Sequence, residues 1–212
     1  MTLSSHLRSW SRRLAGRAWR DDRAAQLVEF AVALPLLVVF VVGIFDFSNA
    51  FTLKQKLTNA ARDGARVAAA DPASDLSSPS TPVPSSVIDA YQVVYNNLAA
   101  SSINTCGLLA SGGNAPSTST GLTWTYTGTT NCPPGGLTIT VNRGYYFPQT
   151  GATLPSVTCA SQSPGGQTTL IGTCVSIQFA YPWRFGKVAS LMGRTASLPT
   201  QVTAAAVAMN EN

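Results

Sequence analysis

The side chains that could act as acids, bases or nucleophiles are few and widely separated along the 212-residue chain. The sole histidine, His6, lies in an arginine-rich amino-terminal arm. The acidic residues beyond residue 45 show no spacing typical of hydrolysis, metal binding or nucleophile activation. We therefore expect no enzymatic activity, no metal and no cofactor. These acidic residues are Asp46, Asp63, Asp71, Asp75, Asp89 and Glu211.

The four cysteines form the other reactive set, and successive members are separated by 26, 27 and 15 residues. This spacing lacks a C-x-x-C pair, so zinc binding and thiol redox chemistry are disfavoured. An even number of cysteines in an oxidising compartment predicts two disulfides. Of the three pairings, we prefer Cys106 with Cys132 and Cys159 with Cys174, because each closes a Gly- and Ser-rich excursion. Free buried thiols are the alternative.

The amino-terminal region combines a basic arm with a long apolar run. Six arginines and two aspartates give residues 1–23 a net charge of +4, which leaves +1 for the rest of the chain. Residues 24–45 carry a single charge, on Glu29. A helix of this length reaches about 33 Å, enough to cross a bilayer. The positive-inside rule places the arm in the cytoplasm and residues after Asp46 outside. Because the body shows no basic patch, we expect no binding to nucleic acid.

Two other interpretations of this region stay open. The basic and apolar stretches could form a secretory signal that is cleaved after Ser48-Asn49-Ala50, which would release the remaining domain. An ionised Glu29 in an apolar run costs about 2.5–3.5 kcal/mol at a helix centre and less near the interface. Its carboxylate could extend toward lipid headgroups or pair with Arg23.

The sequence around Glu29 resembles that of a known family. Residues 24–30 read Ala-Ala-Gln-Leu-Val-Glu-Phe and residues 33–37 read Ala-Leu-Pro-Leu-Leu. Together they resemble the TadE-like family, the minor pseudopilins of the Tad (Flp) type IV pilus system. The family's pattern usually has glycine where this chain has Ala24, a departure that bears on processing.

The resemblance implies a processing step and a set of partners. A prepilin peptidase would cut between Ala24 and Ala25, so that Glu29 becomes the fifth residue of the mature chain. Glu29 could then neutralise the free amine of Ala25 on a neighbouring subunit, which assigns Glu29 and Phe30 to subunit assembly. The other implied partners are the inner-membrane Tad assembly platform, further pilin-like subunits and membrane lipid.

The pattern beyond the apolar run predicts an amphipathic stalk helix over residues 46–71. Small and apolar residues recur every three or four positions, and polar residues follow the opposite face. The helix should end at Asp71-Pro72, since proline disfavours a helical residue before it. The small residues allow close approach either to the chain's own sheet or to a neighbouring subunit.

Residues 72–212 are expected to form an extracytoplasmic domain that contains both disulfides. A Pro- and Ser-rich loop over 72–86 leads to a second helix, for which Ser86 and Asp89 resemble a capping box. Short alternating runs then predict strands, and the tail over 201–209 suits either a closing strand or a helix. The predicted fold is α+β and pilin-like, with a long amino-terminal transmembrane and stalk helix packed on an antiparallel sheet.

The sequence therefore indicates a structural subunit in a bacterial inner membrane. It would cross the membrane once after a leader over 1–24 and a transmembrane helix over 25–45, with its amino terminus in the cytoplasm. The alternative is a tethered or secreted recognition module whose aromatic side chains stack on sugars. The candidate aromatic residues are Trp124, Tyr145, Tyr146 and Trp183.

Overall fold

The computed structural model describes residues 22–77, 82–110, 115–146, 159–160, 171–185 and 198–211. They divide into two compact units: the first contains the described residues up to Phe47 together with Arg184 and Phe185, and the second contains the described residues of Ser48–Trp183 and Ser197–Asn212. The helical elements are α2 (Asp22–Ala70), a 3-10 turn η1 (Ala73–Ser77) and α3 (Ser85–Ala100). The strands are β1 (Thr118–Thr120), β2 (Thr123–Gly128), β3 (Leu137–Tyr146), β4 (Ile171–Ala180) and β5 (Gln201–Met209).

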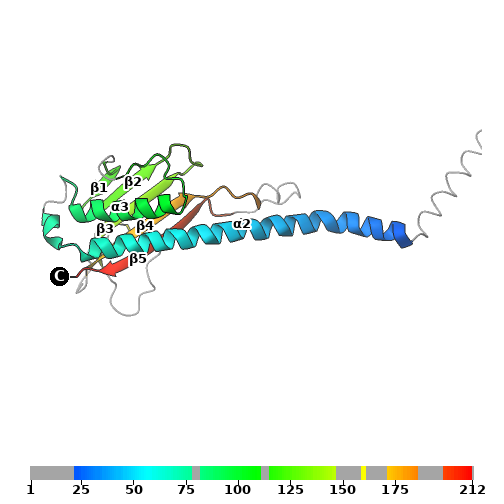
Figure 1. Cartoon of the computed structure of the whole chain (residues 1–212), viewed down its shortest axis with the longest axis horizontal. Helices are drawn as coiled ribbons and strands as arrows, with labels where there is room; N and C mark the ends of the chain where they lie inside the picture. Colours follow the sequence, from blue (N-terminus) through cyan, green and yellow to red (C-terminus); the bar gives the residue numbers. More distant parts are fainter. Residues whose placement is uncertain are drawn as a thin grey trace, which may run out of the picture. The chain divides into compact units, whose positions relative to one another are not determined.

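Helix α2 is one continuous element of 49 residues (Figure 1). Its sequence is rich in alanine and leucine, which favour helix, and it contains Pro35 without interruption. The helix ends at Ala70, directly before the Asp71-Pro72 pair that the sequence analysis expected to stop it. The apolar run and the amphipathic stretch are therefore parts of a single helix.

The second unit contains a five-stranded antiparallel sheet in which the strands pair in chain order, from β1 to β5. The tail is thus a strand, which settles the open choice between strand and helix, because nine of its residues pair with β4. β1 was not anticipated, since its three residues are polar and exposed. The two faces of the sheet differ in exposure, because buried residues alternate with partly exposed ones along β2 and the first part of β3.

One face of the sheet is covered by α3 and by the carboxyl-terminal part of α2, which run side by side (Figure 1). Leu57 of α2 and Leu98 of α3 are fully buried in the same core as Trp124 of β2 and Ile177 of β4. This arrangement confirms the predicted α+β class, with a long amino-terminal helix and an antiparallel sheet. The small residues of α2 serve the chain's own core in this unit.

The expected capping box of α3 is wrong. Pro84 precedes the helix, no side chain caps it, and the hydroxyl of Ser86 is buried without a hydrogen-bond partner. Instead, the main-chain N–H of Ser86 donates to Oδ2 of Asp75 in η1, at 3.0 Å. A carboxylate from an earlier turn therefore satisfies an amide at the helix start, a role that local sequence spacing could not reveal.

Candidate functional site: helix α2 from its apolar segment to its end

The apolar segment of α2 exposes its side chains along most of its length. An 18-residue window has a mean hydropathy of 2.7, and only 6% of that window is buried. Leu27, Phe30 and Leu37 are each more than half exposed. Within the described residues, α2 contains one segment that is long and apolar enough to cross a membrane. Such a surface requires an apolar surrounding, which lipid or other helices can supply.

The residues predicted for processing and assembly all lie in this segment. Ala24 and Ala25 fall within the first turns of α2, and Ala25, Glu29 and Phe30 are exposed. The carboxylate of Glu29 is therefore presented outward from an apolar helix surface. None of the residues that the structure describes buries it, so its surroundings depend on lipid or a second molecule.

Asp46 marks the point where the apolar run ends, and it binds a segment distant in sequence. Its Oδ2 accepts hydrogen bonds from the main-chain N–H groups of Arg184, at 2.8 Å, and Phe185, at 2.9 Å. Asp46 is only 4% exposed, so both bonds form away from bulk water. A buried carboxylate with two amide donors is strongly favoured over one without them.

The ring of Phe185 packs on the same turn of α2. Its centroid lies 6.2 Å from that of Phe47, and its ring atoms would lie 3.2 Å from a Cβ placed on Gly43. The absence of a side chain at Gly43 thus lets the ring approach the helix. Gly43, Asp46 and Phe47 together form a docking turn for Arg184 and Phe185. This pairing has no local signal in the sequence, because Asp46 and Arg184 are separated by 138 residues.

The carboxyl end of α2 carries a second buried polar arrangement, centred on Arg143. This side chain is fully buried, and its Nη1 donates to the carbonyl oxygen of Ala68 and to Oγ1 of Thr173. Its Nη2 donates to the carbonyl oxygen of Asp71, at 3.1 Å. The guanidinium therefore satisfies carbonyls that a helix end leaves without partners, and its charge opposes the negative end of the helix dipole.

Arg143 reaches the helix end because β3 carries a bulge. The register between β3 and β4 shifts between Asn142 and Tyr145, where two residues of β3 stand opposite one of β4. Asn142 donates from Nδ2 to the carbonyl oxygens of Cys159, at 3.3 Å, and Ala160, at 3.1 Å. Asn142 thus binds residues 159–160, whereas the adjacent Arg143 binds the end of α2. Sequence analysis missed Arg143, although a charge that interrupts an alternating apolar strand beside glycine was the available signal.

The charges around Arg143 influence one another. Burial raises the pKa of Asp71, as do the nearby carboxylates of Asp89 and Asp75, while Arg143 acts in the opposite direction. Burial lowers the pKa of Arg143, and the charges of Asp75 and Asp71 oppose that change. Oδ2 of Asp71 and Nε of Arg143 have no hydrogen-bond partner. The arrangement thus concentrates negative charge around one buried cation.

Two disulfides link parts of the second unit, with Cys106 bonded to Cys132 and Cys159 to Cys174. This is the pairing preferred from the sequence among the three. Closing a loop of 15 to 26 residues contributes on the order of 3 kcal/mol by the chain-entropy argument.

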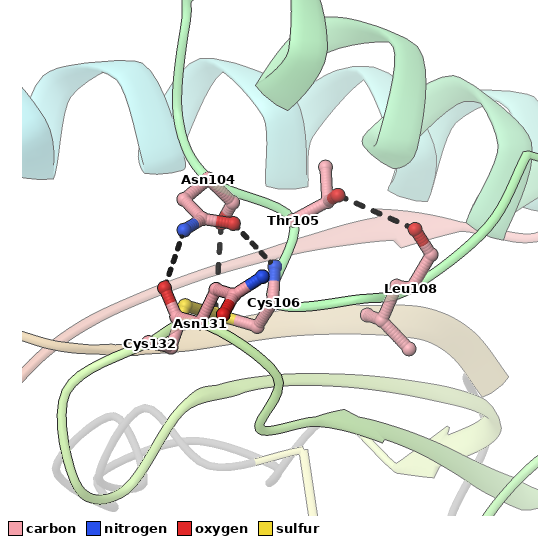
Figure 2. Close-up of a disulfide and its surroundings, with 6 residues drawn as sticks. All are labelled: Asn104, Thr105, Cys106, Leu108, Asn131 and Cys132. Carbon is pink, nitrogen blue, oxygen red and sulfur yellow. Dashed lines mark hydrogen bonds between the residues drawn. A yellow bond between two sulfur atoms is a disulfide. The ribbon is translucent and has the colours of Figure 1, made fainter.

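Asn104 holds the first disulfide in place (Figure 2). Its Nδ2 donates to the carbonyl oxygen of Asn131, at 2.7 Å, and its Oδ1 accepts from the N–H of Cys106, at 2.9 Å. Cys106 and Asn131 adopt positive φ angles of 55° and 57°, which the disulfide and these hydrogen bonds help to hold. The loop after α3 is therefore fixed to the turn before β3.

The four aromatic residues considered for sugar binding do not form an exposed platform. Trp124 is fully buried and Tyr145 is 6% exposed. Trp183 is half-buried and its indole N–H donates to the carbonyl oxygen of Pro199. Trp124 and Tyr145 thus belong to the interior, and the prediction that they stack on sugars is wrong.

The contacts described above hold elements of the fold together. In the described ranges, no group of three His, Cys, Asp or Glu side chains is placed to hold a metal ion. Asp46, Asn142, Arg143 and Asn104 each bond to main-chain groups. What the geometry provides is an exposed apolar helix, a docking turn at its end and a buried clamp at the carboxyl end of α2.

Comparison with known proteins identifies a match for the first of these features. The model of the TadE-like protein family matches residues 24–66, which lie within α2. The match agrees with the resemblance seen in the sequence and covers about a fifth of the chain, including the apolar run. The proteins of this family are pilus-related structural proteins. Neither the curated proteins nor the solved structures that we compared gave a significant match.

Proposed function

We propose that this chain is a minor pseudopilin of a Tad (Flp) type IV pilus system, anchored in the inner membrane and assembled through α2. The exposed apolar surface of residues 25–45, with a carboxylate at Glu29, is the observation that carries the proposal. A single-pass anchor alone needs the apolar residues but has no use for a charge among them. An assembling helix uses both, because a neighbour can supply the counter-charge.

The proposed mechanism begins with cleavage between Ala24 and Ala25 by a prepilin peptidase. This step removes the arginine arm and creates a free amine on Ala25, in the first turns of the apolar segment. Glu29 of an adjacent subunit pairs with that amine, so two expensive charges in lipid become one ion pair. The pair fixes the axial offset between subunits, and Phe30 packs beside it.

The orientation follows from the basic arm and the disulfides. The arginines before residue 24 hold the amino terminus in the cytoplasm, and the second unit lies outside, where an oxidising compartment maintains both disulfides. The inner-membrane assembly platform and other pilin-like subunits are the partners of the processed helix.

Processing is tested by co-expression with a prepilin peptidase, followed by the intact mass of the product. Loss of residues 1–24 supports the pseudopilin. Loss of residues 1–50 identifies a secreted domain, and an unprocessed chain identifies a plain membrane anchor. Either of the last two results overturns the proposal.

Assembly is tested by replacing Glu29 in the chain with its partners present. We expect Glu29→Ala to reduce incorporation into pilus assemblies at least about tenfold, since removing one partner of a buried ion pair costs about 3–5 kcal/mol. Gln26→Ala, at an exposed polar residue one turn earlier, is the matched control and should assemble normally. Equal incorporation of the Glu29 variant and the control would exclude the charge-pair mechanism.

A further inference from the structure

A polar groove lies between α2 and α3 in the second unit, and its lining is rich in positive charge. Residues Lys56, Arg62 and Arg66 of α2 line it together with Asp63, the one acidic residue among them. Asn97 of α3 and Ser101 form the other wall. Three cations and one carboxylate give the groove a net charge of +2.

The groove is fixed by hydrogen bonds that leave its arginines exposed. Nζ of Lys56 donates to the carbonyl oxygen of Ser101, at 3.0 Å, and Nδ2 of Asn97 donates to Oδ2 of Asp63, at 3.2 Å. These bonds tie α3 to α2 at two levels. Arg62 and Arg66 are exposed and present their guanidinium groups to an incoming carboxylate.

The opposite charge gathers at the carboxyl end of α2. Asp71 lies between the end of α2 and η1, and Asp75 of η1 accepts a hydrogen bond from the N–H of Ser86 in the first turn of α3, the helix that also carries Asp89. The main-chain N–H of Glu211 donates to the carbonyl oxygen of Ala69, at 3.1 Å, so the chain's second glutamate follows the same helix end. Arg143 is the buried cation of this region and offers no charge at the surface. We call this group of four acidic residues the acidic end.

The segregation of charge is nearly complete in the described part of the second unit. Apart from the buried Arg143, its cations all lie on α2 between residues 54 and 66. Four of its five acidic residues belong to the acidic end, and the fifth, Asp63, is engaged with Asn97 in the groove. One molecule therefore presents both halves of a complementary electrostatic contact.

We infer that two copies of this chain associate head to tail, with the acidic end of one copy in the basic groove of another copy further along the same assembly. The inference rests on the proposed function, because assembly through α2 holds the copies parallel. Nine to fifteen residues separate Arg62 and Lys56 from Asp71, a distance of about 14–22 Å along the helix. The proposed pair of Glu29 with Ala25 offsets adjacent copies by four residues, or about 6 Å, so parallel copies about three steps apart in the assembly bring the two surfaces together.

A second copy explains both surfaces, whereas a lipid headgroup explains only the groove. Anionic headgroups would be attracted to Arg62 and Arg66 but repelled by the acidic end. A head-to-tail contact uses different surfaces on its two partners, so each added copy leaves one groove and one acidic end free. The contact can therefore repeat along a filament. Its exposed charges mainly select orientation and partner.

The contact is tested by zero-length crosslinking of the full chain in membranes. Equal amounts of chain labelled with nitrogen-14 and nitrogen-15 are co-assembled and treated with a carbodiimide, which joins a lysine amine to a carboxylate that touches it. We expect crosslinks from Lys56 to Asp89 or Glu211, the exposed members of the acidic end, in peptides that pair one light and one heavy chain. Crosslinks found only within one chain would overturn the inference.

Charge reversal provides the matched test. Arg62→Glu with Arg66→Glu should reduce the mixed crosslinks at least about fivefold, corresponding to about 1 kcal/mol. Mixing this variant with an Asp89→Lys, Glu211→Lys chain should restore mixed crosslinking, now between the introduced lysines of one chain and the introduced glutamates of the other. Arg184→Glu, outside the groove, is the control. Unchanged crosslinking in the groove variant, or no restoration on mixing, overturns the inference.

These measurements separate the inference from the proposed function. Leader removal and the dependence of assembly on Glu29 report on the proposed function, and both should be normal in the groove variant. A chain that is processed and assembled but gives no mixed crosslink refutes the head-to-tail contact alone. A groove variant that floats with anionic vesicles less than the parent, without any mixed crosslink in the parent, assigns the groove to lipid and refutes the inference.

Discussion

Nη2 of Arg143 lies 3.1 Å from the carbonyl oxygen of Asp71, 72 residues earlier in the chain. The same guanidinium reaches the carbonyl oxygen of Ala68 in the last turn of α2. The carbonyl oxygens in the last turn of a helix have no partner within that helix, and at an exposed helix end they bond to water. Here the end of α2 is built into the interior of the second unit, so the helix and the sheet depend on one side chain.

Replacing that side chain should destabilise the second unit. We expect Arg143→Met to lower the free energy of unfolding by about 2–4 kcal/mol, because the two carbonyl oxygens lose their donors while remaining buried. Chemical denaturation of the full chain in detergent, followed by tryptophan fluorescence, measures the change. Arg66→Met, at an exposed position of the same unit, should change stability by less than about 0.5 kcal/mol. Equal effects of the two substitutions would contradict the role of Arg143.

The raised pKa of Asp71 predicts a pH dependence with a defined sign. A carboxyl group whose pKa is higher in the folded than in the unfolded protein binds more protons when folded, so the stability it contributes is present below its ordinary value near 4. That contribution is lost as the pH rises through the folded pKa. Asp71→Asn should therefore be more stable than the parent at pH 7, and the difference should shrink as the pH falls through the raised pKa of Asp71 and be smallest below about 4.

Unfolding curves at a series of pH values test this sign. Asp89→Asn is the informative comparison, since Asp89 is the second cause of the raised pKa after burial. Its removal should weaken the pH dependence of the parent without abolishing it. A parent that gains stability steadily between pH 4 and pH 7, relative to Asp71→Asn, would show that the pairing with Arg143 outweighs burial.

The docking turn predicts a local change in protease sensitivity. Asp46→Ala removes the acceptor for the N–H groups of Arg184 and Phe185, so the peptide bond between these two residues should become accessible to trypsin. Asp46→Asn keeps one carbonyl oxygen and should have a smaller effect. Fragment masses from limited digestion in detergent measure the cut after Arg184. Identical digestion of Asp46→Ala and the parent would exclude a role for Asp46 in holding this segment.

The sequence predicted those features whose cause is local. Proline at position 72 ends α2 at Ala70, and alternation of apolar residues such as Ile139 and Ile177 marks the strands. The tail stayed ambiguous because alanine suits both helix and strand, and pairing with β4 decides the outcome. The first turn of α3 was misread because the carboxylate that binds its amide comes from Asp75, eleven residues earlier.

The contacts that position the candidate site could not be predicted in the same way. Arg143 and Asp46 bind main-chain atoms 75 and 138 residues away, and carbonyl and amide groups have no signature in the sequence. Only the fold brings such partners together. By contrast, Glu29 was noticed at once because a charge in an apolar run conflicts with its surroundings whatever the fold.

The close approach of α2 to α3 is tested at Gly64. A Cβ at this position would lie 2.6 Å from Cγ2 of Val94 and 3.3 Å from the carbonyl oxygen of Ala90. Alanine favours a helix over glycine by about 1 kcal/mol, but overpacking a buried contact costs about 1–3 kcal/mol. Because Val94 is fully buried and cannot turn away freely, we expect crowding to prevail and Gly64→Ala to destabilise the second unit.

A double-mutant cycle separates crowding from backbone effects at this contact. Val94→Ala removes the methyl group that a Cβ on Gly64 would meet, so Gly64→Ala should cost less in that background, with a coupling of about 1–3 kcal/mol. Gly43→Ala is the matched control on the same helix, since its nearest contact is a Phe185 ring at 3.2 Å that can move slightly. If Gly64→Ala destabilises equally with and without Val94, the close contact between the helices is not what requires glycine there.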